Sequence, residues 1–217
     1  LPPAIADRDA NGAVQISHPA GGRIVYTTDG SEPTAASPVY AGPLQLPGNA
    51  VVKAARLLPG GRLGVAGSRS FVGLSPRGWK VTAVDGEKSG RAALAVDGDP
   101  ATFWDTGWDD ANKAPKSITI DMGAARRIAG LAYLPRQDGQ VLGTVVNYRF
   151  ETSVDGEQWQ TAVAQGTFSN IQNNPDWQTA RFAPLEARFF RFTALNDVWH
   201  TGGANAAELT VIPTDQD

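Results

Sequence analysis

The sequence predicts an all-β protein built of short strands, either a sandwich or a jelly roll. Glycine (24) and proline (15) are plentiful among its 217 residues, as expected where many turns join short strands. Asp-Gly pairs at 29–30 and 155–156 are strong turn signals between strand-like runs. No 11-residue window in residues 1–73 has the periodicity of an amphipathic helix.

Residues 1–73 are expected to form a first, small β domain. The runs 14–16 and 23–28 are rich in β-branched and aromatic residues, as strands are. Further strand-like runs lie at 39–40, 51–56 and 71–72. The segment 73–78 is short, polar and contains glycine, serine and proline, so it is the expected domain boundary.

Residues 78–213 are expected to form the second domain. The run 117–122 alternates apolar and polar residues, as does 148–154. The other strand-like runs are 79–84, 180–182, 189–193 and 208–212. Several short strands at regular spacing are typical of a sandwich or jelly roll. The two halves are not repeats of each other.

An acidic turn within residues 92–104 is the strongest candidate for a metal site. Asp97, Asp99 and Thr102 place oxygen atoms on a tight turn, and Ca²⁺ takes six to eight oxygen ligands. The alternative is an Asx turn, in which the carboxylates accept hydrogen bonds from nearby backbone amides. An EF-hand is excluded, because with Asp97 as position 1 the sixth residue is Thr102 and the twelfth is Trp108. A metal here needs a ligand from a distant part of the chain.

Composition excludes several partners and chemistries. The net charge is −3 without a lysine or arginine run, so neither nucleic acid nor an anionic membrane surface is an expected partner. No stretch approaches the ~20 apolar residues of a membrane span. The absence of cysteine excludes disulfides and thiolate ligands. No secretory signal starts at Leu1, so we expect the numbering to begin inside a longer precursor.

Six segments in the second half occur in the order found in a known family. They are Ala-Val-Asp-Gly-Asp-Pro-Ala-Thr-Phe-Trp at 95–104, Asp-Met-Gly at 121–123, Tyr-Leu-Pro-Arg-Gln-Asp-Gly at 133–139, Ser-Val-Asp-Gly-Glu-Gln-Trp at 153–159, Ala-Arg-Phe-Phe-Arg-Phe at 187–192 and Ala-Ala-Glu-Leu at 206–209. Residues 78–213 thereby resemble a discoidin (coagulation factor 5/8 type C) module of the bacterial kind, a family 32 carbohydrate-binding module. The resemblance implies a jelly-roll β-sandwich.

The first half is similar to the immunoglobulin-like domain near the C-termini of chitobiases. The run 26–34 (Tyr-Thr-Thr-Asp-Gly-Ser-Glu-Pro-Thr), Tyr40 and the run 51–54 carry this similarity. Together with the loop 166–175, the pairing of the two modules resembles the C-terminal region of bacterial family 29 α-L-fucosidases. A catalytic glycosidase domain would then lie N-terminal in the precursor.

The discoidin resemblance implies a structural Ca²⁺ site. Side-chain oxygens would come from Asp97, Thr102 and Glu208, with a further oxygen from Asp99. Carbonyl groups near Leu94 and from Ala207 would complete the set. Such an ion would join chain positions more than 100 residues apart, stabilising the native state by binding it selectively. The alternative is that Glu208 pairs with an arginine.

The resemblance also implies a carbohydrate site on loops at one edge of the sandwich. Arg136 matches the arginine of the family's Pro-Arg-Gln-Asp-Gly segment, and a guanidinium can bind adjacent sugar hydroxyls. Its alternative role is a local ion pair with Asp138. Trp199 is the expected stacking aromatic, with His200 beside it, because tryptophan in a polar loop is hard to explain as core. Trp108 is a further expected platform.

Two departures from the family pattern affect this site. Asp105 stands where many sugar-binding members carry histidine, and Leu142-Gly143 stands in place of their Asn-Gly. Either the specificity differs, with Asp105 accepting hydrogen bonds from hydroxyls, or sugar binding has been lost. The amides of Asn173 and Asn174 are further candidates, although Asn-Asn-Pro also fits a plain turn.

The expected function is that of a non-catalytic accessory region of a glycoside hydrolase. Five of the 22 acidic residues lie in Asp-Gly pairs, for which a turn is a sufficient explanation, and no nucleophile elbow occurs, so we expect no catalytic residues. The expected ligand is a glycan with terminal galactose, N-acetylgalactosamine or fucose, bound outside the cytoplasm by a secreted, periplasmic or cell-surface protein. The alternatives are a structural module that binds no sugar and a phospholipid-binding module, the second disfavoured by the acidic loops.

Overall fold

The computed structural model describes residues 2–86, 91–106 and 115–214. Its regular structure consists of β-strands and two 3₁₀ helices, so the predicted all-β class is confirmed. The chain divides between Ser75 and Pro76 into two compact units, called unit 1 and unit 2 below. A search of the described residues finds no helix long and apolar enough to cross a membrane.

Unit 1 consists of two three-stranded antiparallel sheets. One sheet has the order β1-β2-β4 and the other β3-β5-β6. Their strands are β1 Ile5–Arg8, β2 Ala13–Ser17, β3 Ile24–Thr27, β4 Leu44–Gln45, β5 Ala50–Arg56 and β6 Gly67–Phe71, with the 3₁₀ helix η1 at Pro59–Gly61. The run 39–40, expected to be a strand, forms only an isolated bridge between Val39 and Val25.

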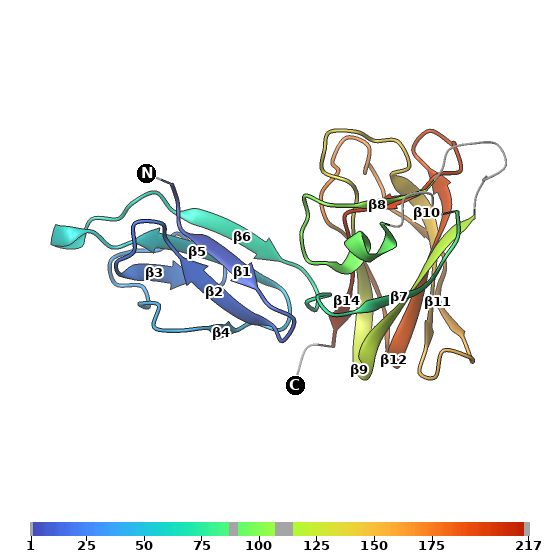
Figure 1. Ribbon diagram of the computed structural model, residues 1–217, viewed down its shortest axis with the longest axis horizontal. Helices are drawn as coiled ribbons and strands as arrows, with labels where there is room; N and C mark the ends of the chain where they lie inside the picture. The colour runs from blue at the N-terminus through green and yellow to red at the C-terminus, as the bar shows by residue number, and fades with distance from the viewer. Residues whose placement is uncertain (1, 87–90, 107–114, 215–217) are drawn as a thin grey trace. The chain divides into compact units, whose positions relative to one another are not determined.

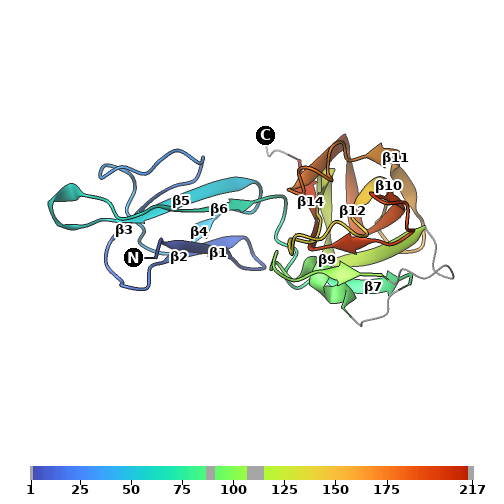
Figure 2. The same ribbon diagram turned by 90° about the horizontal axis from the view of Figure 1, so that it is seen from above.

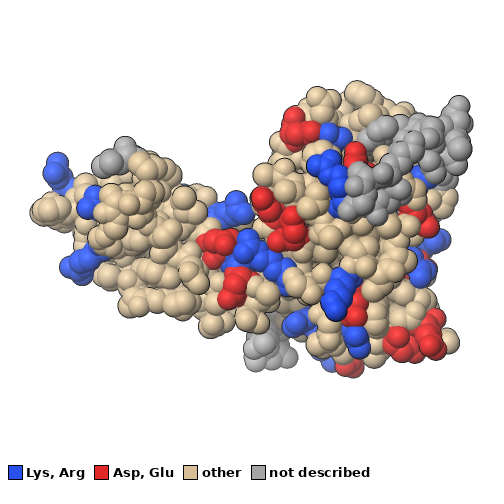
Figure 3. Space-filling model, in the orientation of Figure 1, with Lys and Arg blue, Asp and Glu red and all other residues tan. Residues whose placement is uncertain are grey.

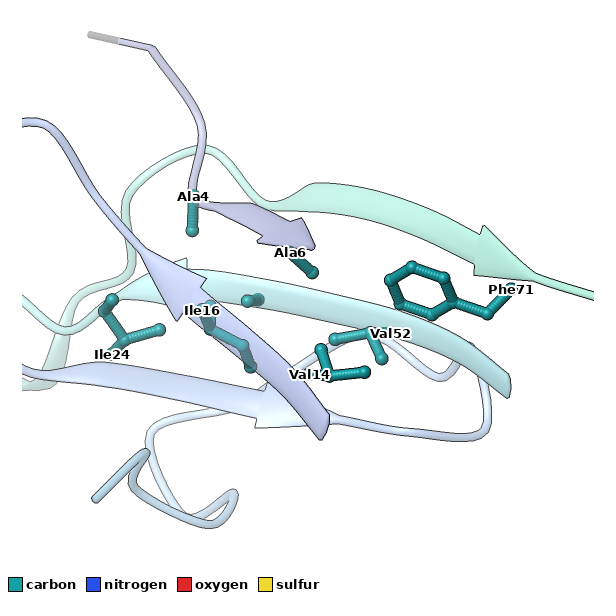
Figure 4. Packing of buried hydrophobic residues seen from close by; sticks show 8 residues of the cluster. Ala4, Ala6, Val14, Ile16, Ile24, Val52 and Phe71 are labelled. Atoms are coloured by element: carbon teal, nitrogen blue, oxygen red, sulfur yellow. The ribbon is translucent and has the colours of Figure 1, made fainter. Parts of the chain in front are cut away.

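The core of unit 1 lies between its two sheets. Figure 4 shows Ala6, Val14, Val52 and Phe71 directed toward one another from strands of both sheets. The alternation of buried and exposed residues along β1 and β2 places one face of each strand inward. Burial of these apolar side chains supplies the main driving force for this small fold.

Arg8 is a buried cation that ties the end of unit 1 together. Its side chain donates hydrogen bonds to the carbonyl oxygens of Gly48 at 2.8 Å and Gly73 at 3.0 Å. The guanidinium also lies 5.0 Å from the centroid of the Phe71 ring. These contacts fix the chain just past β6, the last strand of the unit.

Replacing Arg8 by alanine should destabilise unit 1 by about 2–4 kcal/mol, because the buried carbonyl groups lose charged donors. Hydrogen exchange of the β1 and β5 amides would measure the change within this unit. Arg62→Ala, which removes an exposed guanidinium from the same unit, is the control and should leave exchange unchanged. Equal exchange in both variants would contradict the role of Arg8.

Unit 2 is built on a six-stranded antiparallel sheet with the order β11-β10-β12-β9-β14, in which β7 also pairs with β9 (Figures 1 and 2). A two-stranded sheet pairs β13 with β8. The strands are β7 Lys80–Val84, β8 Trp104–Asp105, β9 Lys116–Leu134, β10 Val145–Ser153, β11 Gln160–Thr167, β12 Gln178–Asp197, β13 Asn205–Ala206 and β14 Glu208–Pro213, with the 3₁₀ helix η2 at Ala92–Val96.

The strands β9 and β12 are longer than the sequence pattern predicts. The runs 180–182 and 189–193 belong to the single strand β12, and β9 continues to Leu134. Register shifts at 181/185 and 187/189 of β12 bend this ribbon. The first half of β9 pairs with β7 and its second half with β14, so one ribbon serves both layers of the sandwich.

A stack of aromatic rings fills the interior of unit 2. Phe168 lies 4.2 Å from Tyr148 and 5.2 Å from Tyr133, measured between ring centroids. Phe192 also stacks on both tyrosines, at 5.5 Å from Tyr133 and 5.7 Å from Tyr148. Burial raises the pKa of Tyr133, so its hydroxyl stays protonated and donates a hydrogen bond to the Asn205 carbonyl at 3.0 Å. The aromatic core is thereby connected to the loops above it.

Candidate functional site

The acidic turn after η2 adopts a compact, internally hydrogen-bonded form. The Asp97 carboxylate accepts hydrogen bonds from the Asp99 amide and the Thr102 hydroxyl, both at 2.8 Å. Gly98 has a φ of +78°, which a side chain would strain. The Asp99 carboxylate accepts a hydrogen bond from the Ala101 amide at 3.0 Å. The Asx-turn contacts of the alternative interpretation are therefore present.

Glu208 is a buried carboxylate that faces the acidic turn. It begins β14, opposite Leu134 of β9, and its exposed fraction is 3%. Neither side-chain oxygen has a hydrogen-bond partner among the described residues. Burial, followed by the charges of Asp97 and Asp99, raises the pKa of Glu208 to about 9. An arginine partner, the alternative considered for this residue, is not what the structure shows.

An ion between Glu208 and the acidic turn would resolve this unfavourable arrangement. A buried carboxylate that accepts no hydrogen bond and lies near the like charge of Asp97 is unfavourable. A hard cation would offset the charges of both carboxylates by binding their oxygens. No three His, Cys, Asp or Glu side chains in the described ranges are placed as a metal cluster. A calcium ion would therefore depend on hydroxyl and carbonyl oxygens as well, for which Thr102, Leu94 and Ala207 are the expected sources.

Arg136 lies at the end of β9 and is held on two sides. Its Nε and Nη2 donate hydrogen bonds to the two carboxylate oxygens of Asp138, at 2.8 and 2.5 Å. Its guanidinium also lies over the Phe103 ring, 4.2 Å from the centroid. The Asp138 pair raises the pKa of Arg136, and the charge of Asp105 adds to this effect. The ion pair uses Nε and Nη2, so Nη1 has no acceptor among the described residues. The N–H groups of Nη1 can therefore donate hydrogen bonds to a ligand.

Phe103 directly precedes the short strand β8, and Asp105 is the last residue of that strand. Trp104 between them is fully buried, so its two neighbours point away from the core. Phe103 was not among the predicted site residues. Its place directly before the buried Trp104 was the signal that could have identified it. Trp108, also predicted as a platform, lies outside the described residues.

Asn205 connects the loops around Arg136. It is fully buried, and its side chain accepts a hydrogen bond from the Arg136 amide at 3.0 Å while donating one to the Leu142 carbonyl at 2.8 Å. Its backbone pairs with Asp105 in the β13–β8 sheet and donates to the Gly143 carbonyl at 2.9 Å. One asparagine therefore fixes the 135–144 loop against β8, a role that the sequence analysis missed.

Asp197 shapes the loop that carries Trp199. This fully buried carboxylate accepts hydrogen bonds from the Thr201 amide at 2.6 Å, the Thr201 hydroxyl at 2.9 Å and the Gly202 amide at 3.0 Å. Trp199 is 56% exposed on this loop. His200, with a φ of +57°, is bonded through Nδ1 to Asn196 at 2.9 Å. An exposed tryptophan on a rigidly held loop is suited to contact a ligand.

Loops distant in sequence form one edge of unit 2. The Val198 amide donates to the Thr144 carbonyl at 2.9 Å, joining the Trp199 loop to the 135–144 loop. Gln137 Nε2 donates to the Pro175 carbonyl at 2.8 Å and adds the loop that contains Asn173 and Asn174. Figure 1 shows these loops together with β8 at the top of unit 2. We call this edge the rim.

The chain matches two protein families. Residues 80–209 match the F5/8 type C domain, and residues 8–63 match the chitobiase/beta-hexosaminidase C-terminal domain. A sialidase from Micromonospora viridifaciens is 37% identical over 134 residues, which cover 59% of this chain and 20% of the sialidase. The chain thus spans about a fifth of the length of the curated relatives it matches.

Solved structures resemble the second half of the chain. CBM32-3 from a family 31 glycoside hydrolase of Clostridium perfringens is 31% identical, with a TM-score of 0.60, and the match covers 65% of this chain and 94% of that chain. The family 32 carbohydrate-binding module of C. perfringens NanJ, in complex with galactose, is 28% identical, with a TM-score of 0.54, and the match covers 63% of this chain and 95% of that chain. The family match spans more than half of the 217 residues, so the chain belongs to the F5/8 type C domain family.

Proposed function

We propose that this chain is a non-catalytic accessory region of a glycoside hydrolase and that its rim binds a glycan with terminal galactose, N-acetylgalactosamine or fucose. The observation that carries the proposal is Trp199, 56% exposed on a loop held by the buried Asp197. A pyranose presents an apolar C–H face that packs on such a ring. Its hydroxyls accept hydrogen bonds from guanidinium donors such as Arg136.

The relatives support the same ligand class. The module from NanJ was solved with galactose, and the curated relatives include a sialidase. Asp105 replaces the usual histidine with a carboxylate that only accepts hydrogen bonds. We therefore expect its contacts to be with sugar hydroxyl donors, beside the donors of Arg136.

Isothermal titration with galactose, N-acetylgalactosamine, fucose and lactose tests the proposal. The wild-type chain should bind at least one of them with a dissociation constant of ~1 mM, the range for a ligand with few contacts. Trp199→Ala and Arg136→Ala should each weaken binding about tenfold, equivalent to about 1.4 kcal/mol.

Val154→Ala is the matched control for Trp199→Ala. It removes another exposed apolar side chain, 51% accessible, just beyond β10 at the end remote from the rim. Its affinity should equal that of the wild type. Thermal unfolding of each variant separates lost contacts from lost structure. Absence of binding by the wild-type chain to all four sugars would overturn the proposal.

The alternative function is a structural module that packs on a catalytic domain without binding sugar. It is favoured by the Arg136–Asp138 ion pair, which occupies two of the three guanidinium nitrogens, and by Leu142 in place of asparagine. Deletion of the region would then lower the stability of the parent enzyme, and a glycan array would give no signal.

The proposal includes a structural calcium ion and an extracellular setting. The unpartnered Glu208 carboxylate beside Asp97 supports the ion. The parent we propose is an α-L-fucosidase, on the pairing of the two modules and the 166–175 loop, acting as a secreted, periplasmic or cell-surface protein. Sequencing the gene upstream of Leu1 would test the identity of the parent.

A further inference from the structure

Two guanidinium groups flank one aromatic ring at the rim. Arg136 lies 4.2 Å and Arg91 5.5 Å from the centroid of Phe103, measured from each guanidinium carbon. Arg91 directly precedes η2, whereas Arg136 follows β9, so the fold brings them together from distant positions. Figure 3 shows basic and acidic side chains gathered on the face of unit 2 over β8.

The two cations differ in how they are neutralised. Arg136 donates hydrogen bonds to both carboxylate oxygens of Asp138 and interacts electrostatically with Asp105. Arg91 is exposed, and its guanidinium has neither a hydrogen bond nor an ion pair with a described residue. Its contact with the Phe103 ring orients the group without consuming its donors. Arg91 thus offers a full positive charge and five N–H donors at the rim.

Such a group gains most from an anionic oxygen. Charge-assisted hydrogen bonds from a guanidinium to a carboxylate or phosphate-like group are about twice as strong as neutral ones, and they can be bidentate. A neutral hydroxyl would leave the charge of Arg91 unmatched. The carboxylate of Asp105 acts on Arg136, so an anion is expected on the Arg91 side of Phe103.

We infer that Arg91 is a specificity residue that selects galactose-type glycans carrying an acidic substituent, a sulfate or a carboxylate. This inference rests on the proposed function, because it assigns the ligand class of the same rim. The sugar ring contacts Trp199 and Arg136, and the acidic substituent contacts Arg91. Both guanidinium groups lie against the Phe103 ring, which places them beside the same part of the rim.

Titration calorimetry with lactose, 3′-sulfated lactose and 3′-sialyllactose tests the inference at 50 and 250 mM NaCl. The wild-type chain should bind one or both acidic probes about three- to fivefold more tightly than lactose at low salt, the range of an exposed ion pair. The advantage should shrink at high salt, because ions screen exposed charges. The sulfated and sialylated probes distinguish which anion fits.

Arg91→Ala should bind the three probes alike, whereas Arg126→Ala should keep the preference of the wild type. Arg126 is an equally exposed cation in the bend of β9, away from the rim. Wild-type binding of lactose without any preference for an acidic probe would overturn the inference and leave the proposed function intact. A preference that survives in Arg91→Ala would also overturn it. Absence of binding to all three probes would overturn the inference, and the proposed function would fall with it only if galactose, N-acetylgalactosamine and fucose also fail to bind.

Discussion

Calcium should raise the unfolding temperature of unit 2 by roughly 5–10 °C, because an ion at about 100 times its dissociation constant adds about 2.7 kcal/mol to the native state. Glu208→Gln should abolish this increase. Glutamine keeps the shape of the buried side chain but removes the charge that a cation requires. Tryptophan fluorescence follows unit 2 selectively, since all six tryptophans lie in it.

The same variant should behave differently in chelator. Burial raises the pKa of Glu208 to about 9 in the metal-free protein, so the native state holds a proton that the unfolded chain releases near pH 4.5. The contribution of Glu208 to the stability of the metal-free wild type is therefore full below pH 4.5 and declines as the pH rises toward 9. Glu208→Gln should lack this decline.

Glu186→Gln is the control, because it removes an exposed carboxylate from β12. It should keep both the calcium response and the pH dependence. If the wild type has the same unfolding temperature in calcium as in chelator, the metal assignment is contradicted. Glu208 would then be a neutral, buried acid that is part of the core.

Replacing Asn205 by alanine should abolish glycan binding and destabilise unit 2 by about 2–4 kcal/mol, since this buried side chain loses its hydrogen bonds to the 135–144 loop. The Arg136 amide and the Leu142 carbonyl would both lose their partner. The 135–144 loop would then no longer be fixed against β8. Calorimetry with the preferred sugar and urea unfolding measure the two effects.

Asn147→Ala is the matched control for this prediction. Its exposed amide donates only to the Thr167 hydroxyl, at 3.0 Å, on strands β10 and β11. The variant should lose no more than about 0.5 kcal/mol, as surface substitutions do, and should bind normally. Retention of full affinity in Asn205→Ala would show that the loops hold their positions without this residue.

The sequence predicts the elements of the fold better than their continuity. Alternating runs such as 117–122 identify strands, because side chains on opposite faces meet different environments. The same pattern cannot show that β9 continues through the exposed residues 123–127, because these residues do not alternate between buried and exposed and the strand resumes its pairing with β12 at Arg126 and Arg127. The run 39–40 was predicted to be a strand from its side chains, but it forms only an isolated bridge. Side chains typical of strands do not by themselves provide a continuous row of backbone pairs.

In the candidate site, too, some residues could be found from local sequence patterns and others could not. Arg136 was a candidate because it matches a segment of the family, and Trp199 because tryptophan is unusual in a polar loop; their contact with a sugar stays a prediction. Asn205 could not, because its role depends on hydrogen bonds to Arg136 and Leu142, more than 60 positions away. Arg91 was missed as well, since only the folded chain places it over Phe103. Spacing in the sequence does not encode such long-range juxtapositions.

The pairing of β7 and β14 with β9 has a consequence for attachment of the module to other parts of a protein. Lys80, where β7 begins, faces Asp121, and Pro213, where β14 ends, faces Ile128. Both connections therefore leave from the middle of one strand, whereas the rim starts beyond its end at Leu134, ~20 Å from Ile128 at 3.3 Å per residue. Neither connection of the chain to unit 2 passes through the rim, so the rim loops can vary in sequence without changing how the module is joined to its neighbours.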